Sequence, residues 1–130
     1  MNRPCTTVLV GALSLTLASC SAFEVADDHA DHADAATIDG APEIVVTAAS
    51  MSFEPDRLEL SVGEPVNIAL TSEDILHDLN IDEVDFHLVA DVDETAVGGL
   101  EFGEPGTYVA YCSVPGHRDA GMEMEVTVDG

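Results

Sequence analysis

Basic residues are almost absent from the sequence, which contains no lysine and only 3 arginines against 26 aspartates and glutamates. The formal net charge is −23 at pH 7 with the histidines neutral. Proteins that bind nucleic acid or anionic lipid present clusters of lysine and arginine, so neither is expected as a direct partner. Two explanations of the acidity remain, which are a cationic protein partner and adaptation to high salinity.

Long apolar runs are also missing, and the longest one lies close to the N-terminus. Residues 8–18 are too few to span a bilayer as a helix and have the length of a signal-peptide core. The run ends in the sequence LASC at positions 17–20, which resembles a bacterial lipobox. This resemblance implies cleavage before Cys20 and attachment of diacylglycerol to its sulfur. The alternative is ordinary cleavage near Ala18 or Ala22, which would release a soluble secreted protein.

Cysteine is scarce, and its three positions divide the chain. Cys5 lies in the expected signal peptide and Cys20 at its end, so Cys112 is the one cysteine of the remaining chain. An exported domain with a single thiol cannot form an internal disulfide. It also cannot form a dinuclear copper centre with two bridging cysteines. A lone thiol in an oxidising compartment is therefore either a hazard or a metal ligand.

The composition predicts three segments, which are a signal peptide at residues 1–19, an acidic tether at residues 20–41 and one folded domain at residues 42–130. The tether is rich in Ala and Asp and has no sustained apolar period, so it cannot bury enough surface to offset the entropy of ordering. We interpret its two histidines, His29 and His32, as incidental residues of a solvated spacer rather than as a weak metal site.

Alternating apolar residues predict that the domain is all-β. A period of two with frequent turn signals is typical of short strands that have one buried face. The pattern recurs at residues 43–48, 58–62, 66–70, 77–81, 86–90, 95–102, 107–113 and 122–128. The turn at Gly63 predicts a hairpin between segments 58–62 and 66–70, and Gly98-Gly99 indicates a bulge. Seven or eight such strands predict a Greek-key β-sandwich.

Metal-ligand residue types gather in one stretch, residues 112–122, which carries Cys112, His117 and Met122. Proline and glycine between them allow a loop to bring the three side chains together. Thiolate and thioether are soft ligands and imidazole is intermediate, a set that favours copper over magnesium or calcium. A trigonal site of one Cys and two His with a weak axial Met is typical of blue-copper electron-transfer centres, and it needs a second His.

His77 is the candidate for that second histidine. Strand alternation places His77 on the same face as the apolar Leu79. The same alternation directs Cys112 inward from the end of its strand. Both side chains are therefore expected to point into the interior. Met124 shares a face with Met122 and is a rival axial ligand.

Supporting contacts are expected around these ligands. A group outside the metal site should hold the second ring nitrogen of His77. The backbone N–H groups of Asp78 and Ser113 should donate to the sulfur of Cys112. His87 falls on the opposite strand face, and we interpret it as a surface or satisfied histidine.

The stretch GTYVAYCSVPGHRDAGM at residues 106–122 resembles the C-terminal copper loop of the cupredoxins. The upstream run FEP at residues 53–55, followed by Gly63 and His77, resembles the first half of the same family. Together these motifs cover residues 42–130. The C-x4-H-x4-M spacing is similar to that of auracyanins, rusticyanins and sulfocyanins.

The resemblance implies a cupredoxin-like sandwich with one type 1 copper per chain, bound by His77, Cys112, His117 and Met122. Many members of the family carry Asn directly after the first histidine, whereas this sequence has Asp78.

These observations predict a membrane-tethered one-electron carrier that is not an enzyme. We expect a monomer outside the cytoplasm, anchored through Cys20 alone, with cationic redox partners such as a cytochrome or a respiratory complex. One alternative is a copper chaperone or sequestration protein, which an exposed Met-rich tract would favour. Another is the type 1 copper domain of a multicopper oxidase or nitrite reductase, which needs additional histidines and domains.

Overall fold

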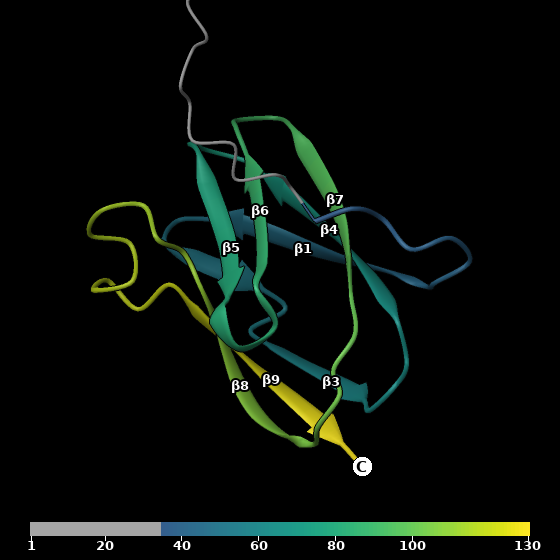
Figure 1. Ribbon diagram of the computed structural model, residues 1–130. Helices are drawn as coiled ribbons and strands as arrows, with labels where there is room; N and C mark the ends of the chain where they lie inside the picture. The colour runs from purple at the N-terminus through teal and green to yellow at the C-terminus, as the bar shows by residue number, and fades with distance from the viewer. Residues whose placement is uncertain (1–34) are drawn as a thin grey trace, which may run out of the picture.

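The computed structural model describes residues 35–130, and residues 1–34, with the expected signal peptide and Cys20, lie outside the described part. Residues 35–130 form a β-sandwich of nine strands in two sheets (Figure 1). The helical structure within this range is one short 3₁₀ helix, η1 (Asp82–Val84). No helix among these residues has the length and hydrophobicity needed to cross a membrane.

The first sheet has four strands in the order β2-β1-β4-β7. They are β1 (Glu43–Ala49), β2 (Ser52–Glu54), β4 (Val66–Ser72) and β7 (Thr95–Leu100). Strand β1 pairs in parallel with β4, and the other neighbours in this sheet are antiparallel.

The second sheet has five strands in the order β3-β9-β8-β5-β6. They are β3 (Arg57–Ser61), β5 (His77–Ile81), β6 (Phe86–Ala90), β8 (Gly106–Tyr111) and β9 (Glu123–Asp129). Strand β3 pairs in parallel with β9, and the other pairs are antiparallel. The chain therefore crosses repeatedly from one sheet to the other, and the all-β sandwich that the alternation predicted is confirmed.

The predicted hairpin between segments 58–62 and 66–70 is wrong. These segments are β3 and β4, which lie in different sheets, and the turn at Gly63 (φ +74°) carries the chain across the sandwich. Each strand does have one buried face, which is the pattern that suggested a hairpin. Alternation determines which residues face the core, but it does not specify the partner strand.

The predicted bulge at Gly98-Gly99 is also wrong, because the ladder between β4 and β7 runs without interruption from Val66↔Leu100 to Thr71↔Thr95. The two glycines instead make room for the segment that precedes β1. A Cβ atom on Gly98 would collide with the backbone of Ala35, and one on Gly99 would collide with the side chain of Ile38.

Hydrogen bonds hold this N-terminal segment against the sandwich. The N–H of Gly99 donates to the carbonyl of Ala36 over 2.9 Å. The side chain of Asn67 accepts from the N–H of Ile38 over 2.8 Å and donates to its carbonyl over 2.9 Å. Residues 35–41, which the composition assigned to the tether, therefore pack against the sandwich.

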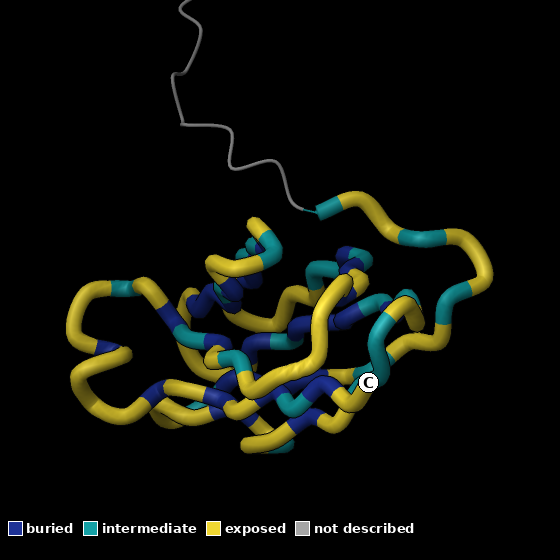
Figure 2. The backbone as a smooth tube through the Cα atoms, turned by 60° about the horizontal axis from the view of Figure 1, so that its bottom comes forward, coloured by how far each residue is buried: buried dark blue, intermediate teal, exposed yellow. Residues whose placement is uncertain are grey.

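The core lies between the two sheets. In Figure 2 the buried positions gather between the layers while the connecting loops are exposed. The fully buried side chains include Val46, Ile68, Leu70, Leu79, Leu88 and Val126. Each such side chain contributes about 1.5–3 kcal/mol relative to exposure, so the sandwich has a core of its own in addition to the candidate metal ligands.

Candidate metal centre

His77, Cys112 and His117 meet at one end of this core. His77 opens β5, Cys112 directly follows β8, and His117 lies on the loop between β8 and β9. The Nδ1 atoms of the two histidines are 3.2 Å apart, and the Cys112 sulfur lies 3.4 Å from Nδ1 of His117 and 3.9 Å from Nδ1 of His77. All three residues are buried, with exposed fractions of 0%, 0% and 5%. The structure therefore brings together three of the four predicted ligands.

The spacing of these three atoms fits a single metal ion. Bonds of roughly 2.0 Å to nitrogen and 2.3 Å to sulfur at trigonal angles separate the ligand atoms by about 3.5–3.7 Å. The observed separations of 3.2, 3.4 and 3.9 Å lie around these values. One soft thiolate and two imidazoles are a donor set that copper favours.

Asp74 supplies the partner that was expected for the second nitrogen of His77. Nε2 of His77 lies 2.7 Å from the Asp74 carboxylate. The hydrogen bond from the Ser50 N–H, followed by that from His77, lowers the pKa of Asp74 to about 2. An ionised carboxylate can only accept, so this contact favours the tautomer of His77 that carries its proton on Nε2. The lone pair of Nδ1 is then left facing Cys112 and His117.

Asp78 joins the two strands that carry ligands. Its carboxylate accepts from the N–H of Ser113 over 2.5 Å and from the Ser113 hydroxyl. The residue that follows His77 is thus bound to the residue that follows Cys112. The ladder between β5 and β8 contains the single pair Asn80↔Tyr111, so this side-chain link extends a short contact between the strands.

The N–H groups that donate to the Cys112 sulfur are those of Asp78 and Val114. The prediction that the N–H of Ser113 donates to this sulfur is wrong, because that N–H donates to the carboxylate of Asp78. Burial raises the pKa of the Cys112 thiol, and the two N–H groups oppose this effect. A bound metal deprotonates a coordinating thiol outright.

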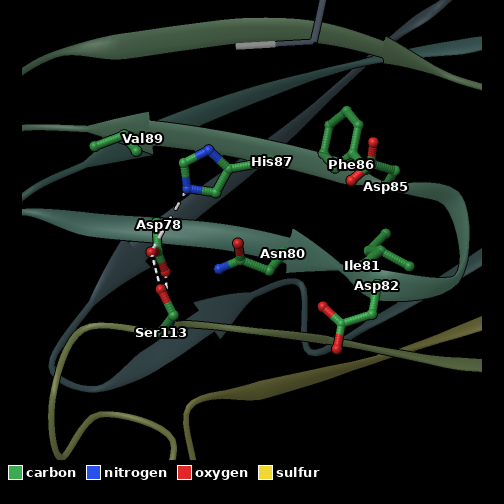
Figure 3. Close-up of a pocket in the computed structure, with 9 residues that line it drawn as sticks. All are labelled: Asp78, Asn80, Ile81, Asp82, Asp85, Phe86, His87, Val89 and Ser113. Carbon is green, nitrogen blue, oxygen red and sulfur yellow. Dashed lines mark hydrogen bonds and ion pairs between the residues drawn. The ribbon is translucent and has the colours of Figure 1, made fainter. Parts of the chain in front are cut away.

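A cavity of about 330 Å³ lies behind the ligands, on the outer face of β5 and β6. Figure 3 shows Asp78 at this cavity, between His87 on one side and Ser113 on the other. Nε2 of His87 is 3.8 Å from the Asp78 carboxylate, so His87 lies on the outer face, as the alternation predicted. The cavity is separate from the metal centre, because His77 and Cys112 point to the opposite face of the sheet.

The loop between Cys112 and Met122 is closed by backbone hydrogen bonds. The N–H of Met122 donates to the carbonyl of His117 over 3.1 Å, and the N–H of Cys112 donates to the carbonyl of Met122 over 3.2 Å. Gly116 and Gly121 have φ angles of +83° and +97°. Residues with a Cβ rarely adopt these values, so the two glycines allow the tight turn that returns the chain to the site.

Met122 faces Cys112 across the pair β8 and β9. The last paired residues are Tyr111↔Glu123, and the hydrogen bond from Cys112 to Met122 continues that register. Facing residues share one side of a sheet, and Met122 is fully buried. Met124 faces Ala110, roughly 7 Å farther along the strand. The register therefore favours Met122 over Met124 as the axial ligand, which stays a prediction.

Sequence reasoning missed Asp74. It is one of 26 acidic residues, and it lies in the loop between β4 and β5, where no periodicity assigns it a direction. The position three residues before a candidate metal-binding histidine is the one available signal, and it is weak.

Comparison with known proteins gives one family and several similar folds. A family model described as copper binding proteins of the plastocyanin/azurin family matches residues 41–129. A comparison with curated proteins found no match.

Three solved structures resemble this chain. Auracyanin B is 19% identical with a TM-score of 0.64, and the match covers 75% of this chain and 96% of that chain. Auracyanin A from Chloroflexus aurantiacus, described as a "blue" copper protein, is 18% identical with a TM-score of 0.60 and coverage of 69% and 100%. The metal-binding domain of the Cu(I)-exporting P-type ATPase CopA of Streptococcus pneumoniae D39, solved with Cu(I), is 19% identical with a TM-score of 0.59 and coverage of 75% and 94%.

These identities support the fold alone, whereas the family model spans nearly all of the described sandwich and includes the buried cluster of two imidazoles and one thiol. The chain therefore belongs to the plastocyanin/azurin family of copper-binding proteins.

Proposed function

We propose that this protein is a one-electron carrier with one type 1 copper held by His77, Cys112, His117 and Met122. The observation that carries the proposal is the convergence of two Nδ1 atoms and one sulfur, all within 4.8 Å of one another in the apolar core. Bound copper would supply the one-electron chemistry by alternating between Cu(I) and Cu(II). The chain contributes a site whose ligands need to move little when the metal changes its oxidation state.

Three sets of contacts restrain the ligands. His77 pairs with Ala90 in the β5–β6 ladder, Asp74 holds its Nε2, and Cys112 is joined to the backbone of Met122. Ligands at the ends of strands are held more firmly than ligands on free loops. Such restraint favours fast electron transfer, because little of the protein has to reorganise.

Burial of the ligands favours a carrier over an enzyme and over a copper chaperone. Catalytic metal sites keep an open position for a substrate. A chaperone must pass its metal to ligands of another protein, which requires accessible donors. His77 and Cys112 are fully buried and His117 is 5% exposed, so we propose that neither a substrate nor a second set of ligands reaches the metal.

The surface around the site offers a place for a redox partner to dock. Met51, Ile75, Leu76 and Val92 are exposed apolar residues. They lie at the metal end of the sandwich, since the Ser50 N–H binds Asp74 and Val92 forms a bridge with Ser72. We call these four residues the apolar end. Small apolar contact areas suit the brief encounters of redox proteins.

Tyr111 is a second possible exit for the electron because it directly precedes Cys112. Its hydroxyl donates to Asp82 over 2.8 Å, and the guanidinium of Arg118 lies 4.0 Å from the centre of its ring. Arg118 therefore covers this side chain. We propose that electrons leave through His117 and the apolar end, and that the acidic surface steers a cationic partner toward it.

Membrane attachment through Cys20 is a further part of the proposal. It rests on the lipobox-like LASC at positions 17–20, which follows a short apolar run. The protein would then act outside the cytoplasm, with the acidic segment between Cys20 and Ala35 separating the lipid from the packed domain.

Replacing Cys112 by Ser tests the metal site. The copper(II)-loaded protein is expected to show an intense visible thiolate-to-copper band, which Cys112→Ser abolishes because the thiolate of the proposed site is removed. Far-ultraviolet circular dichroism should show that the apo variant retains its fold, since the apolar core is intact. A wild-type protein that is colourless with copper(II), or a variant that stays blue, contradicts the proposed site.

Leucine substitutions distinguish the two buried methionines. Met122→Leu is expected to raise the reduction potential of a site that stays coloured, because a weak donor to copper(II) is lost. Met124→Leu should leave the potential unchanged and serves as the matched control, since both residues are buried and Met-to-Leu exchange usually costs below about 1.5 kcal/mol. The reverse pattern in spectroelectrochemical titrations would make Met124 the axial ligand.

Ionic strength and one surface substitution test the docking. Stopped-flow oxidation by a basic cytochrome should slow as salt rises, because screening over a Debye length of about 8 Å weakens the steering field. A rate that is flat or rises with salt contradicts steering and favours adaptation to salinity.

A surface substitution tests the docking site. Leu76→Asp should slow electron transfer without moving the reduction potential. Val45 is an exposed apolar residue on β1, so Val45→Asp is the control and should change the rate little. An effect confined to Tyr111→Leu would place the exit at the tyrosine.

Intact mass spectrometry of the native protein tests the anchor. The mature chain is expected to begin at Cys20 and to carry the added mass of diacylglycerol, and Cys20→Ala should block this maturation. A mature protein that lacks the lipid would contradict the anchor, and the protein would then be a soluble carrier.

A further inference from the structure

A carboxylate reaches one metal ligand from the surface of the protein. The side chain of Asp74 is 38% exposed, yet one of its oxygens lies 2.7 Å from Nε2 of His77, whose side chain is fully buried. The protein therefore places a carboxylate directly behind one imidazole of the candidate metal centre.

The position of this carboxylate is determined by the neighbouring strands. Asp74 accepts from the N–H of Ser50 over 2.7 Å and from the N–H of Ile75 over 2.8 Å. The N–H of Glu73 donates to the carbonyl of Ala48 over 3.1 Å, which ties the same loop to the end of β1. Ser50 and Met51 both have positive φ angles, 52° and 62°, so the turn after β1 has an uncommon shape that presents the Ser50 N–H to the carboxylate.

We propose that Asp74 is a positioning residue that sets the tautomer and the donor strength of His77. Through the hydrogen bond to Nε2, it keeps the Nδ1 lone pair directed at the metal and makes the imidazole a stronger donor. A stronger donor stabilises copper(II) more than copper(I), so Asp74 lowers the reduction potential. This inference rests on the proposed function, because it concerns the same copper site.

The effect of Asp74 has to be separated from that of the general acidity of the surface. Any negative charge at the metal end favours copper(II) to some extent, because the oxidised site carries one more positive charge. Asp91 is the matched control. It follows Ala90, which pairs with His77, and its carboxylate caps the N–H of Val92 in the same way that Asp74 caps the N–H of Ile75. The described contacts of Asp91 include none with a metal ligand.

Spectroelectrochemical titration of Asp74→Asn and Asp91→Asn makes this separation. Asparagine keeps an oxygen that can accept from Nε2 but removes the charge. Asp74→Asn is expected to reduce the ratio of copper(II) to copper(I) affinity about tenfold, which equals a rise in potential of about 59 mV for one electron. Asp91→Asn should change the ratio less than twofold. Equal shifts in the two variants, or no shift in Asp74→Asn, would overturn the proposal.

Nitrogen NMR of the metal-free protein tests the tautomer independently of copper. In the wild type the His77 proton should reside on Nε2, and Asp74→Ala should mix the two tautomers because the acceptor is removed. Asp74→Ala should also weaken copper binding by roughly 10- to 100-fold, the usual loss when the partner of a ligating histidine is deleted. A wild-type His77 protonated on Nδ1 would overturn the proposal. This measurement decides the position of the proton even if the copper site of the proposed function proves wrong.

Discussion

The candidate metal centre depends on the burial of a thiol and two imidazoles at one end of an apolar core. Buried polar groups are costly unless they have partners, so each donor atom that faces away from the metal position needs a hydrogen bond. Asp74 satisfies Nε2 of His77, and the backbone N–H groups of Asp78 and Val114 satisfy the Cys112 sulfur. The Nδ1 atoms of His77 and His117 and the sulfur of Cys112 face one another, an arrangement that fits a single metal ion.

The sandwich topology makes that arrangement possible. His77 comes from the start of β5 and Cys112 from the end of β8, and the adjacent position of these antiparallel strands brings the two residues to the same end of the core. The bond between Asp78 and Ser113 then locks one ligand strand to the other on the outer face, where Figure 3 shows it. Ligands on the inner face and hydrogen-bonded links on the outer face thus alternate along the same two strands, so the ligands are restrained from both sides of the sheet.

Strand periodicity predicted the sandwich and the inward direction of His77 and Cys112, because alternation along a strand shows which residues share a face. It could not predict that β3 and β4 lie in different sheets, since strand pairing depends on distant contacts. The packing of residues 35–41 was missed for a similar reason, because Gly98 and Gly99, which make room for it, belong to a strand far along the sequence. The role of Asp74 depends on the shape of the turn at Ser50, which local sequence does not reveal.

X-ray absorption at the copper edge tests the central claim most directly, because it reports the atoms around the metal in both oxidation states. We predict one short sulfur and two nitrogen neighbours in the oxidised protein, and the same set with little change in bond length after reduction. A site without a short sulfur, or one that exchanges ligands on reduction, would contradict the account of a rigid, buried copper centre built for electron transfer.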